Sequence, residues 1–269
     1  MSIYPRINRL SQFLRLLKPQ RYIHFTEFII GYFAVVPTVA FVADAEKLLL
    51  IFVSFNVLLY SGLYIVNDLI DLPRDRQHPV KKNRPIAYGA IQPTVALVIA
   101  VLLILFGLLL GGWITPVIIY FELSFLIVNL LYSTILKRIP YLDVLGNAIT
   151  HPLRVVFAIC VFGQLETGHW IIIVGIFIMS VTLCSLKRYK ELVEGGGRFR
   201  LSLRKYSRKW LFYLMVFCYP ILFSLLFFAS SKFVLSVTAG GIFLCLTLFL
   251  GYITSVEPVK KIVDHILAS

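Results

Sequence analysis

Three aspartates and an asparagine form the densest group of potentially reactive side chains in this sequence. Asn67, Asp68, Asp71 and Asp75 lie at the end of a long apolar run, and the whole chain has only thirteen acidic residues. If this segment is helical, the three aspartates fall at i, i+3 and i+7 and share one face. Carboxylates beside a bilayer are costly and usually mark a functional site. Three hard oxygen ligands suit Mg²⁺, which typically binds one or two carboxylates together with substrate phosphates.

The residues that follow this acidic group are rich in cations. His78, Lys81 and Arg84 come within ten residues of Asp75, and such side chains can contact phosphate oxygens, Arg in a bidentate manner. The pattern predicts diphosphate chemistry at a membrane surface, with Asn67 orienting the acidic group or coordinating the metal. The alternative is that the aspartates only offset neighbouring cations at a solvated helix end.

A second polar pattern runs through the apolar stretch at 142–163. Asp143, Asn147, His151 and Arg154 are spaced by four, four and three residues, so one helix would place them on one face. Polar residues on a membrane helix are expected to face the bundle interior or a cavity. We expect them to line a substrate cavity. The alternative is a structural network in which Asp143 or Glu122 pairs with Arg154.

The end of the apolar stretch at 114–135 and the residues just after it add three candidates for substrate binding. Asn129 and Tyr132 would share a helix face and could line the same cavity. Lys137 could contact a phosphate, or it could act with Arg138 only as an anchor on the cytoplasmic side.

A second cation-rich segment covers residues 187–209. It has nine Lys and Arg against two carboxylates, a surplus that suits a ligand with several phosphates. Lys187, Arg188 and Glu191 are its candidate binding residues, and the three glycines at 195–197 would let the segment close over a ligand. The alternative is that these cations set the topology or bind lipid headgroups, with Lys187 and Glu191 forming a pair.

The composition indicates a membrane protein that crosses the bilayer several times. Of the 269 residues, 59% are hydrophobic and 14% are charged, which a soluble domain could not bury. The absence of alternating barrel strands favours helices. We expect an all-α membrane helical bundle of eight or nine transmembrane helices around a central cavity open to the lipid, forming one domain over 1–269 with an interfacial segment at 1–24. The expected spans are 25–43, 48–66, 93–111, 114–135, 142–163, 169–186, 210–229 and 232–252.

The distribution of cations predicts the topology. The net charge is +13, and 23 of the 26 Lys and Arg lie on one side of the expected spans, which places both termini and the basic loops in the cytoplasm of a multi-pass cell-membrane protein. The basic character therefore reports topology and an anionic substrate, and nucleic-acid binding is not expected. The four cysteines lie within spans without paired spacing and are expected to be small core residues.

The acidic motif resembles that of the UbiA superfamily of intramembrane prenyltransferases. That family carries N-D-x-x-D-x-x-x-D at the inner end of its second helix, as Asn67, Asp68, Asp71 and Asp75 do here. The resemblance covers nearly the whole chain and implies nine helices around a cavity open to the lipid, whereas eight spans are expected here. Most members have a second motif, D-x-x-x-D, after the sixth helix, where this sequence has the stretch that begins at Lys187.

That departure, together with the H-P-x-K-x-x-R-P stretch at residues 78–85, is similar to one branch of the superfamily, the decaprenyl-phosphate phosphoribosyltransferases. The resemblance implies transfer of 5-phosphoribose from phosphoribosyl pyrophosphate (PRPP) to a polyprenyl phosphate, with Mg²⁺ on the departing pyrophosphate. It implies that Lys187 and Arg188 hold the 5-phosphate and that Glu191 supports a second metal or a ribose hydroxyl. The lipid phosphate is already ionised, so no strong general base is needed.

Two other functions remain open at this point. One is orthodox prenyl transfer from a prenyl diphosphate to an aromatic or quinone-precursor acceptor. The other is a transporter or scaffold for anionic headgroups, against which the clustering of carboxylates and basic loops on one membrane face argues.

Overall fold

The computed structural model describes residues 9–193, 202–227, 237–242, 245–246 and 249, and these residues form helices and no strand. The all-α prediction is confirmed for this part of the chain. The chain divides into two compact units, one made of residues 1–25 and 39–134 and the other of residues 26–38 and 135–269.

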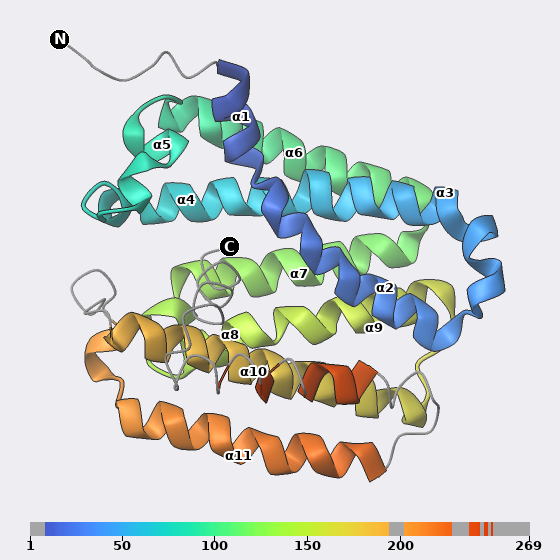
Figure 1. The fold of residues 1–269 in the computed structure, drawn as a ribbon. Helices are drawn as coiled ribbons and strands as arrows, with labels where there is room; N and C mark the ends of the chain where they lie inside the picture. The colour runs from blue at the N-terminus through green and yellow to red at the C-terminus, as the bar shows by residue number, and fades with distance from the viewer. Residues whose placement is uncertain (1–8, 194–201, 228–236, 243–244, 247–248, 250–269) are drawn as a thin grey trace. The chain divides into compact units, whose positions relative to one another are not determined.

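The first unit is built around three long helical segments, which Figure 1 shows in blue to green. Its elements are α1 (Arg9–Leu17), η1 (Pro19–His24), α3 (Phe41–Ile51), the π-helix η3 (Phe52–Tyr60), α4 (Ser61–Asp75), η4 (Lys81–Asn83), α5 (Pro85–Tyr88), α6 (Pro93–Ile114) and α7 (Pro116–Thr134). The short η2 (Thr38–Ala40) precedes α3. α3, η3 and α4 follow one another without a break, so one helical segment carries the chain to the acidic motif.

Small residues on α6 and α4 let α6 approach the continuous helical segment α3–η3–α4 closely. A side chain at Gly107 would meet the backbone of Ser54 and Leu59 at 3.0 and 2.9 Å, and one at Gly62 would meet the Ala100 carbonyl at 2.9 Å. Membrane helices commonly use such residues to pack their backbones together. This close packing fixes the position of α4 within the unit.

The second unit contains the remaining elements. They are α2 (Phe25–Val35), η5 (Leu136–Arg138), α8 (Leu142–Ala148), α9 (Thr150–Phe162), η6 (Thr167–His169), α10 (Trp170–Val193), η8 (Ser202–Lys205) and α11 (Arg208–Phe227). α10 packs against α8, α9 and α11. A buried group on these elements, Val144, Ala148, Val181, Cys184, Leu203 and Leu211, forms one of its cores.

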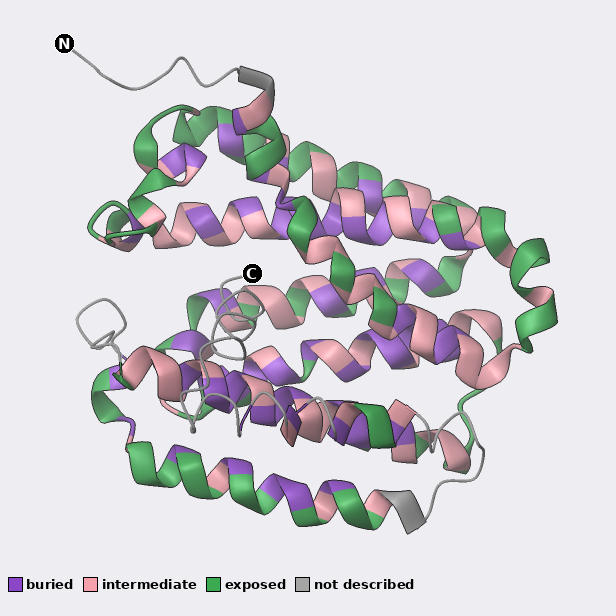
Figure 2. Cartoon of the chain, in the orientation of Figure 1, coloured by how far each residue is buried: buried purple, intermediate pink, exposed green. Residues whose placement is uncertain are grey.

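Six helical segments are long and apolar enough to cross a membrane among the described residues: Thr38–Asp75, Pro93–Ile114, Pro116–Arg138, Leu142–Phe162, Thr167–Val193 and Arg208–Leu225. Figure 2 shows exposed positions along α6, where the large apolar side chains Val95, Leu97, Val98, Val101, Leu102, Leu105, Phe106, Leu109 and Trp113 lie at the surface. Contiguous exposed apolar surface of this kind suits contact with lipid.

The expected boundaries of the first two spans are wrong. The stretch 25–43 is interrupted after α2, where Pro37 follows Val36, and α2 alone has eleven residues, about 16 Å, too short for a hydrocarbon core of about 30 Å. The expected connection at 44–47 lies inside α3. The expected span at 232–252 lies mostly outside the described residues, so the total of eight stays a prediction.

The expected interfacial segment at 1–24 is helical over Arg9–Leu17 and buries part of its surface within the protein. Leu16 is fully buried in a core with Ile65 and Ile86, whereas Leu14 is exposed. α1 therefore packs on α4 and α5 of its own unit.

Candidate functional site

The acidic motif forms the centre of a charged cluster in the first unit. α4 continues through Asp75, so the prediction that Asp68, Asp71 and Asp75 lie on a helix is confirmed. Asp68 and Asp75 are each 3% exposed, and Asp71 is half-buried. One guanidinium nitrogen, Nη1 of Arg84, donates to Asp68 Oδ1 at 2.9 Å and to Asp75 Oδ2 at 2.7 Å. The two carboxylates therefore converge on a single point.

Lys18 is a member of this cluster that the sequence reasoning missed. Its Nζ donates to Asp68 Oδ1 at 2.7 Å and lies 5.0 Å from the centre of the Tyr64 ring. Burial lowers the pKa of Lys18 to about 8, although the Asp68 carboxylate opposes that shift. Nothing in its spacing distinguished Lys18 from Arg15 or Arg21. Only the packing of α1 on α4 brings it to the acidic motif.

Asn67 is held by the neighbouring helix of the same unit. Its Oδ1 accepts a hydrogen bond from Ser133 Oγ of α7 at 3.1 Å. Ser133 is buried and Tyr132, the residue before it, is half-buried. The hydroxyl of Ser133 thus orients the Asn67 amide one residue before Asp68.

The turn after α4 presents the predicted phosphate-binding residues. Nδ1 of His78 accepts the backbone N–H groups of Val80 and Lys81 at 3.2 and 3.3 Å, so this imidazole shapes the turn. Arg84 ends η4 in an extended conformation just before α5. Gly89 closes α5 at φ 87°, a left-handed conformation that favours glycine. This short path returns Arg84 to the carboxylates of α4.

The expected polar wall on one helix at 142–163 is wrong in its arrangement. The stretch forms two helices joined at Ile149, with Asp143 on α8 and Arg154 on α9. Asp143 Oδ2 accepts from Arg188 Nε at 2.8 Å, and Arg154 pairs with Glu27, a partner that neither the expectation nor its alternative named. A separate helix supplies the ionic partner in each case.

Asp143 is the centre of the charged cluster of the second unit. It is fully buried, and it accepts from Arg188 of α10 and from the hydroxyl of Tyr206. Burial and the Asp143 carboxylate raise the pKa of Tyr206, so this phenol stays protonated and donates. Nη1 of Arg188 donates to both oxygens of Glu191 at 3.0 Å. Tyr206 was missed because a tyrosine in a basic segment carries no distinguishing spacing.

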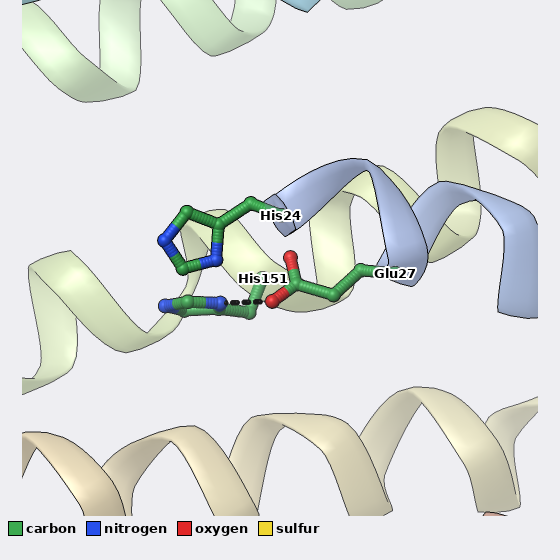
Figure 3. Close-up of side chains that lie close together, drawn as sticks. All are labelled: His24, Glu27 and His151. Atoms are coloured by element: carbon green, nitrogen blue, oxygen red, sulfur yellow. Dashed lines mark hydrogen bonds and ion pairs between the residues drawn. The ribbon is translucent and has the colours of Figure 1, made fainter. Parts of the chain in front are cut away.

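A third polar group joins α2 to α9 in the second unit. Nδ1 of His151 and Glu27 Oε1 are 2.5 Å apart, and Arg154 Nη1 donates to Glu27 Oε2 at 3.0 Å. Figure 3 shows the Glu27 and His151 side chains with this bond, together with His24, one turn before Glu27 in the chain. A side chain at Gly31 would strike the Val155 carbonyl. Glycine at that position therefore lets the two helices meet.

The remaining predicted residues are placed individually. Nδ2 of Asn147 lies 3.0 Å from Cys184 Sγ. Lys137 is buried in η5, and Lys187 is half-buried on α10. Residues 194–201, which include the three glycines proposed to close over a ligand, lie outside the described residues.

The two charged clusters differ in chemical capacity. Two buried carboxylates that converge on one cationic nitrogen form a donor set that fits Mg²⁺, because this ion binds carboxylate oxygens in a compact arrangement. In the second unit, a buried guanidinium bridges a buried and a partly exposed carboxylate. Its fork geometry suits bidentate recognition of carboxylate or phosphate.

Comparison with known proteins gives matches over most of the chain. The model of the UbiA prenyltransferase family matches residues 28–261. The chain is 30% identical over 187 residues to decaprenyl-phosphate phosphoribosyltransferase of Mycolicibacterium smegmatis, covering 66% of this chain and 58% of that protein. It is 31% identical over 156 residues to the Corynebacterium glutamicum protein of the same name, covering 56% and 46%. The chain thus spans less than two thirds of the length of these curated relatives.

A solved structure has the same fold. The structure of a UbiA homologue from Archaeoglobus fulgidus bound to GPP and Mg²⁺ aligns with a TM-score of 0.70 at 19% identity, covering 96% of this chain and 97% of that one. This likeness supports the fold of the chain.

Proposed function

Because the chain belongs to the UbiA prenyltransferase family, a family of transferases embedded in membranes, we propose that it transfers 5-phosphoribose from PRPP to a polyprenyl phosphate and releases pyrophosphate. The observation that carries this proposal is that the chain has both an acidic cluster around Asp68 and a basic α10 terminus around Arg188. The similarity to relatives named decaprenyl-phosphate phosphoribosyltransferase supports the donor.

The acidic cluster is assigned to the pyrophosphate end of the donor. Asp68, Asp71 and Asp75 would hold Mg²⁺, which supplies stabilisation of the charge that develops on departing pyrophosphate. Arg84 is 27% exposed at its side chain, so it can exchange a carboxylate for a phosphate oxygen. Lys18 and Lys81 add positive charge beside the same group.

The second cluster is assigned to the 5-phosphate. Lys187 and Arg188 bind this phosphate, which competes with Glu191, the more exposed partner of Arg188. Asp143 keeps the guanidinium oriented from the buried side. The polyprenyl phosphate supplies the nucleophilic oxygen, and its tail lies among apolar helices. The distribution of cations supports a reaction at the cytoplasmic face, with both termini on that side.

The decisive experiment incubates purified protein with ribose-labelled PRPP, polyprenyl phosphate and Mg²⁺. Formation of a labelled lipid, dependent on Mg²⁺ and lost in Asp68→Asn, supports the proposal. A parallel reaction with a prenyl diphosphate and an aromatic acceptor tests the alternative that the family description favours. Prenylated acceptor without labelled lipid would overturn phosphoribosyl transfer, and the absence of both products would overturn the assignment as an enzyme acting on either donor.

A further inference from the structure

Glu122 is a buried acid that the proposed reaction does not use. It lies on α7 inside a membrane span and is 0% exposed. Its Oε1 is 2.5 Å from Ser54 Oγ of η3, and its Oε2 is buried without a hydrogen-bond partner. Within the described part of the chain no ion pair involves Glu122. An ionisable residue inside a membrane is by default a sign of function.

The hydrogen bonds of Ser54 indicate the protonation state of this acid. Ser54 Oγ is 2.9 Å from the Gly107 carbonyl and 2.5 Å from Glu122 Oε1. A hydroxyl has one proton to donate, so both contacts are full hydrogen bonds only if the carboxyl group donates to Ser54 while Ser54 donates to Gly107. Burial of an unpaired carboxylate would cost far more than burial of the neutral acid. The geometry is therefore that of a neutral carboxylic acid.

Ser54 belongs to an uncommon piece of backbone. η3 is a π-helix over nine residues, whereas π-helices are rare and mostly single turns, often at functional sites. Because a π-turn holds one more residue than an α-turn, the length of η3 sets the direction in which the side chains of α4 point. α4 begins at the next residue and carries Asp68, Asp71 and Asp75.

The surroundings of Glu122 fit a device that holds η3. A side chain at Gly111 of α6 would strike Glu122 Oε2, and one at Gly107 would press on the η3 backbone at Leu59. Glycines at these two positions, one turn apart, leave room for the carboxyl group and for the π-turns together. The two hydrogen bonds that link Glu122, Ser54 and Gly107 thus join α7, η3 and α6 inside one unit.

We propose that Glu122 is a neutral acid that donates a hydrogen bond to Ser54. This bond holds the π-helical turns of η3 in place and thereby orients the aspartates of α4. Glu122 is a positioning residue of the metal site, and this part rests on the proposed function. The protonation and the clamp on η3 do not depend on it.

The first test measures protonation directly. The infrared spectrum of the wild-type protein at neutral pH should contain the C=O stretching band of a buried protonated carboxyl group, and Glu122→Gln should lack it. A spectrum without that difference would overturn the neutral acid.

The second test compares variants of the clamp. Glu122→Gln keeps a neutral donor, whereas Glu122→Leu and Ser54→Ala remove the bond. Hydrogen exchange of amides 52–75 should be faster in the latter two and unchanged in Glu122→Gln. Ser124→Ala is the matched control, because Ser124 also donates to a backbone carbonyl, that of Tyr120 in its own helix, but is exposed. Unchanged hydrogen exchange in Glu122→Leu and Ser54→Ala would overturn the proposal that Glu122 holds η3. Equal exchange rates in Glu122→Gln and Glu122→Leu would overturn it as well.

The third test reads the metal site with Mn²⁺, which carboxylates bind as they bind Mg²⁺. Relative to Asp68→Asn as background, Glu122→Leu should weaken Mn²⁺ binding about tenfold or more, a size typical of residues that orient ligands, and Glu122→Gln should not. Equal Mn²⁺ affinity in Leu and wild type would overturn the positioning role. If the wild type binds no more Mn²⁺ than Asp68→Asn, the metal assignment of the proposed function fails, while the first two tests still decide the clamp.

Discussion

The clusters around Asp68 and Asp143 are built from the same chemical groups with opposite exposure. Around Asp68, two buried carboxylates share one guanidinium, and that of Arg84 is the more exposed partner at 27%. Around Asp143, the Arg188 guanidinium is 3% exposed, and the exposed partner is Glu191 at 30%. The first cluster can therefore exchange its cation, whereas the second can exchange its anion.

That difference predicts which kind of ligand each cluster can bind. A divalent cation replaces an exposed cation with little loss of burial, and a phosphate replaces an exposed carboxylate in the same way. The buried side chains, Asp68 and Asp75 in the first cluster and Arg188 in the second, would stay in place during this exchange. Four substitutions test this contrast, in order of decreasing effect.

Asp68→Asn should have the largest effect, because it removes the carboxylate that both Lys18 and Arg84 contact. We expect turnover to fall about 10³-fold, the size seen when one group that stabilises developing charge is removed, or roughly 4 kcal/mol. Initial rates of labelled-lipid formation measure this effect. Asp44→Asn, on α3, is the control. If turnover of Asp68→Asn falls by less than about tenfold, the assignment of the metal to this cluster is overturned.

Asp143→Asn should act mainly on folding. It leaves the buried Arg188 guanidinium without its carboxylate, and breaking a buried pair in this way costs about 3 kcal/mol or more. This loss of stability is measured by thermal unfolding in detergent, with the disappearance of the monodisperse peak as the signal. The double variant Asp143→Asn with Arg188→Gln should regain part of the loss. If the single variant unfolds at the wild-type temperature, Asp143 is no buried anchor.

Tyr206→Phe should have a smaller effect in the same cluster. It removes a hydrogen bond to Asp143 and one from the Tyr141 backbone N–H, which Tyr206 accepts at 2.7 Å. Loss of such bonds to buried groups costs about 1–3 kcal/mol. The same unfolding measurement applies, with Tyr213→Phe on the exposed face of α11 as the matched control. Equal unfolding temperatures for these two variants would contradict the role of Tyr206.

Glu191→Gln should have the smallest effect and the opposite sign. Because Glu191 is partly exposed, its pair with Arg188 is worth at most about 1 kcal/mol, so removal of its charge should lower the KM for PRPP by about twofold to fivefold. Steady-state kinetics at saturating polyprenyl phosphate measure this change. A higher KM would mean that Glu191 itself contacts the donor and that the second cluster does not exchange an anion.

Sequence patterns predicted those structural features that depend on residues close together in the chain. The long apolar stretches predicted membrane helices, and the spacing of Asp68, Asp71 and Asp75 predicted a shared helix face that α4 provides. Pro37 marks the break in the first expected span, but the apolar residues on both sides of it gave the whole stretch the composition of a single span. Asp44, Glu46 and Lys47 made residues 44–47 resemble a polar connection, but α3 is helical there.

Partners that come from distant segments could not be predicted. Lys18 lies fifty residues from Asp68 and Tyr206 sixty-three from Asp143, and neither has a spacing that marks it. The pairing of Glu27 with Arg154 depends on the close approach that Gly31 permits, which the sequence records only as a glycine.

The amino-acid sequence was enough to predict a helical membrane protein with an acidic motif at a helix end and an excess of cations. These properties follow from hydrophobicity, helical period and residue charge, which act over a few turns. Only the tertiary structure decided which cation neutralises which carboxylate and which partner of each pair remains exposed. Those outcomes depend on how closely helices pack, and that distance is set by small residues on facing helices far apart in the chain.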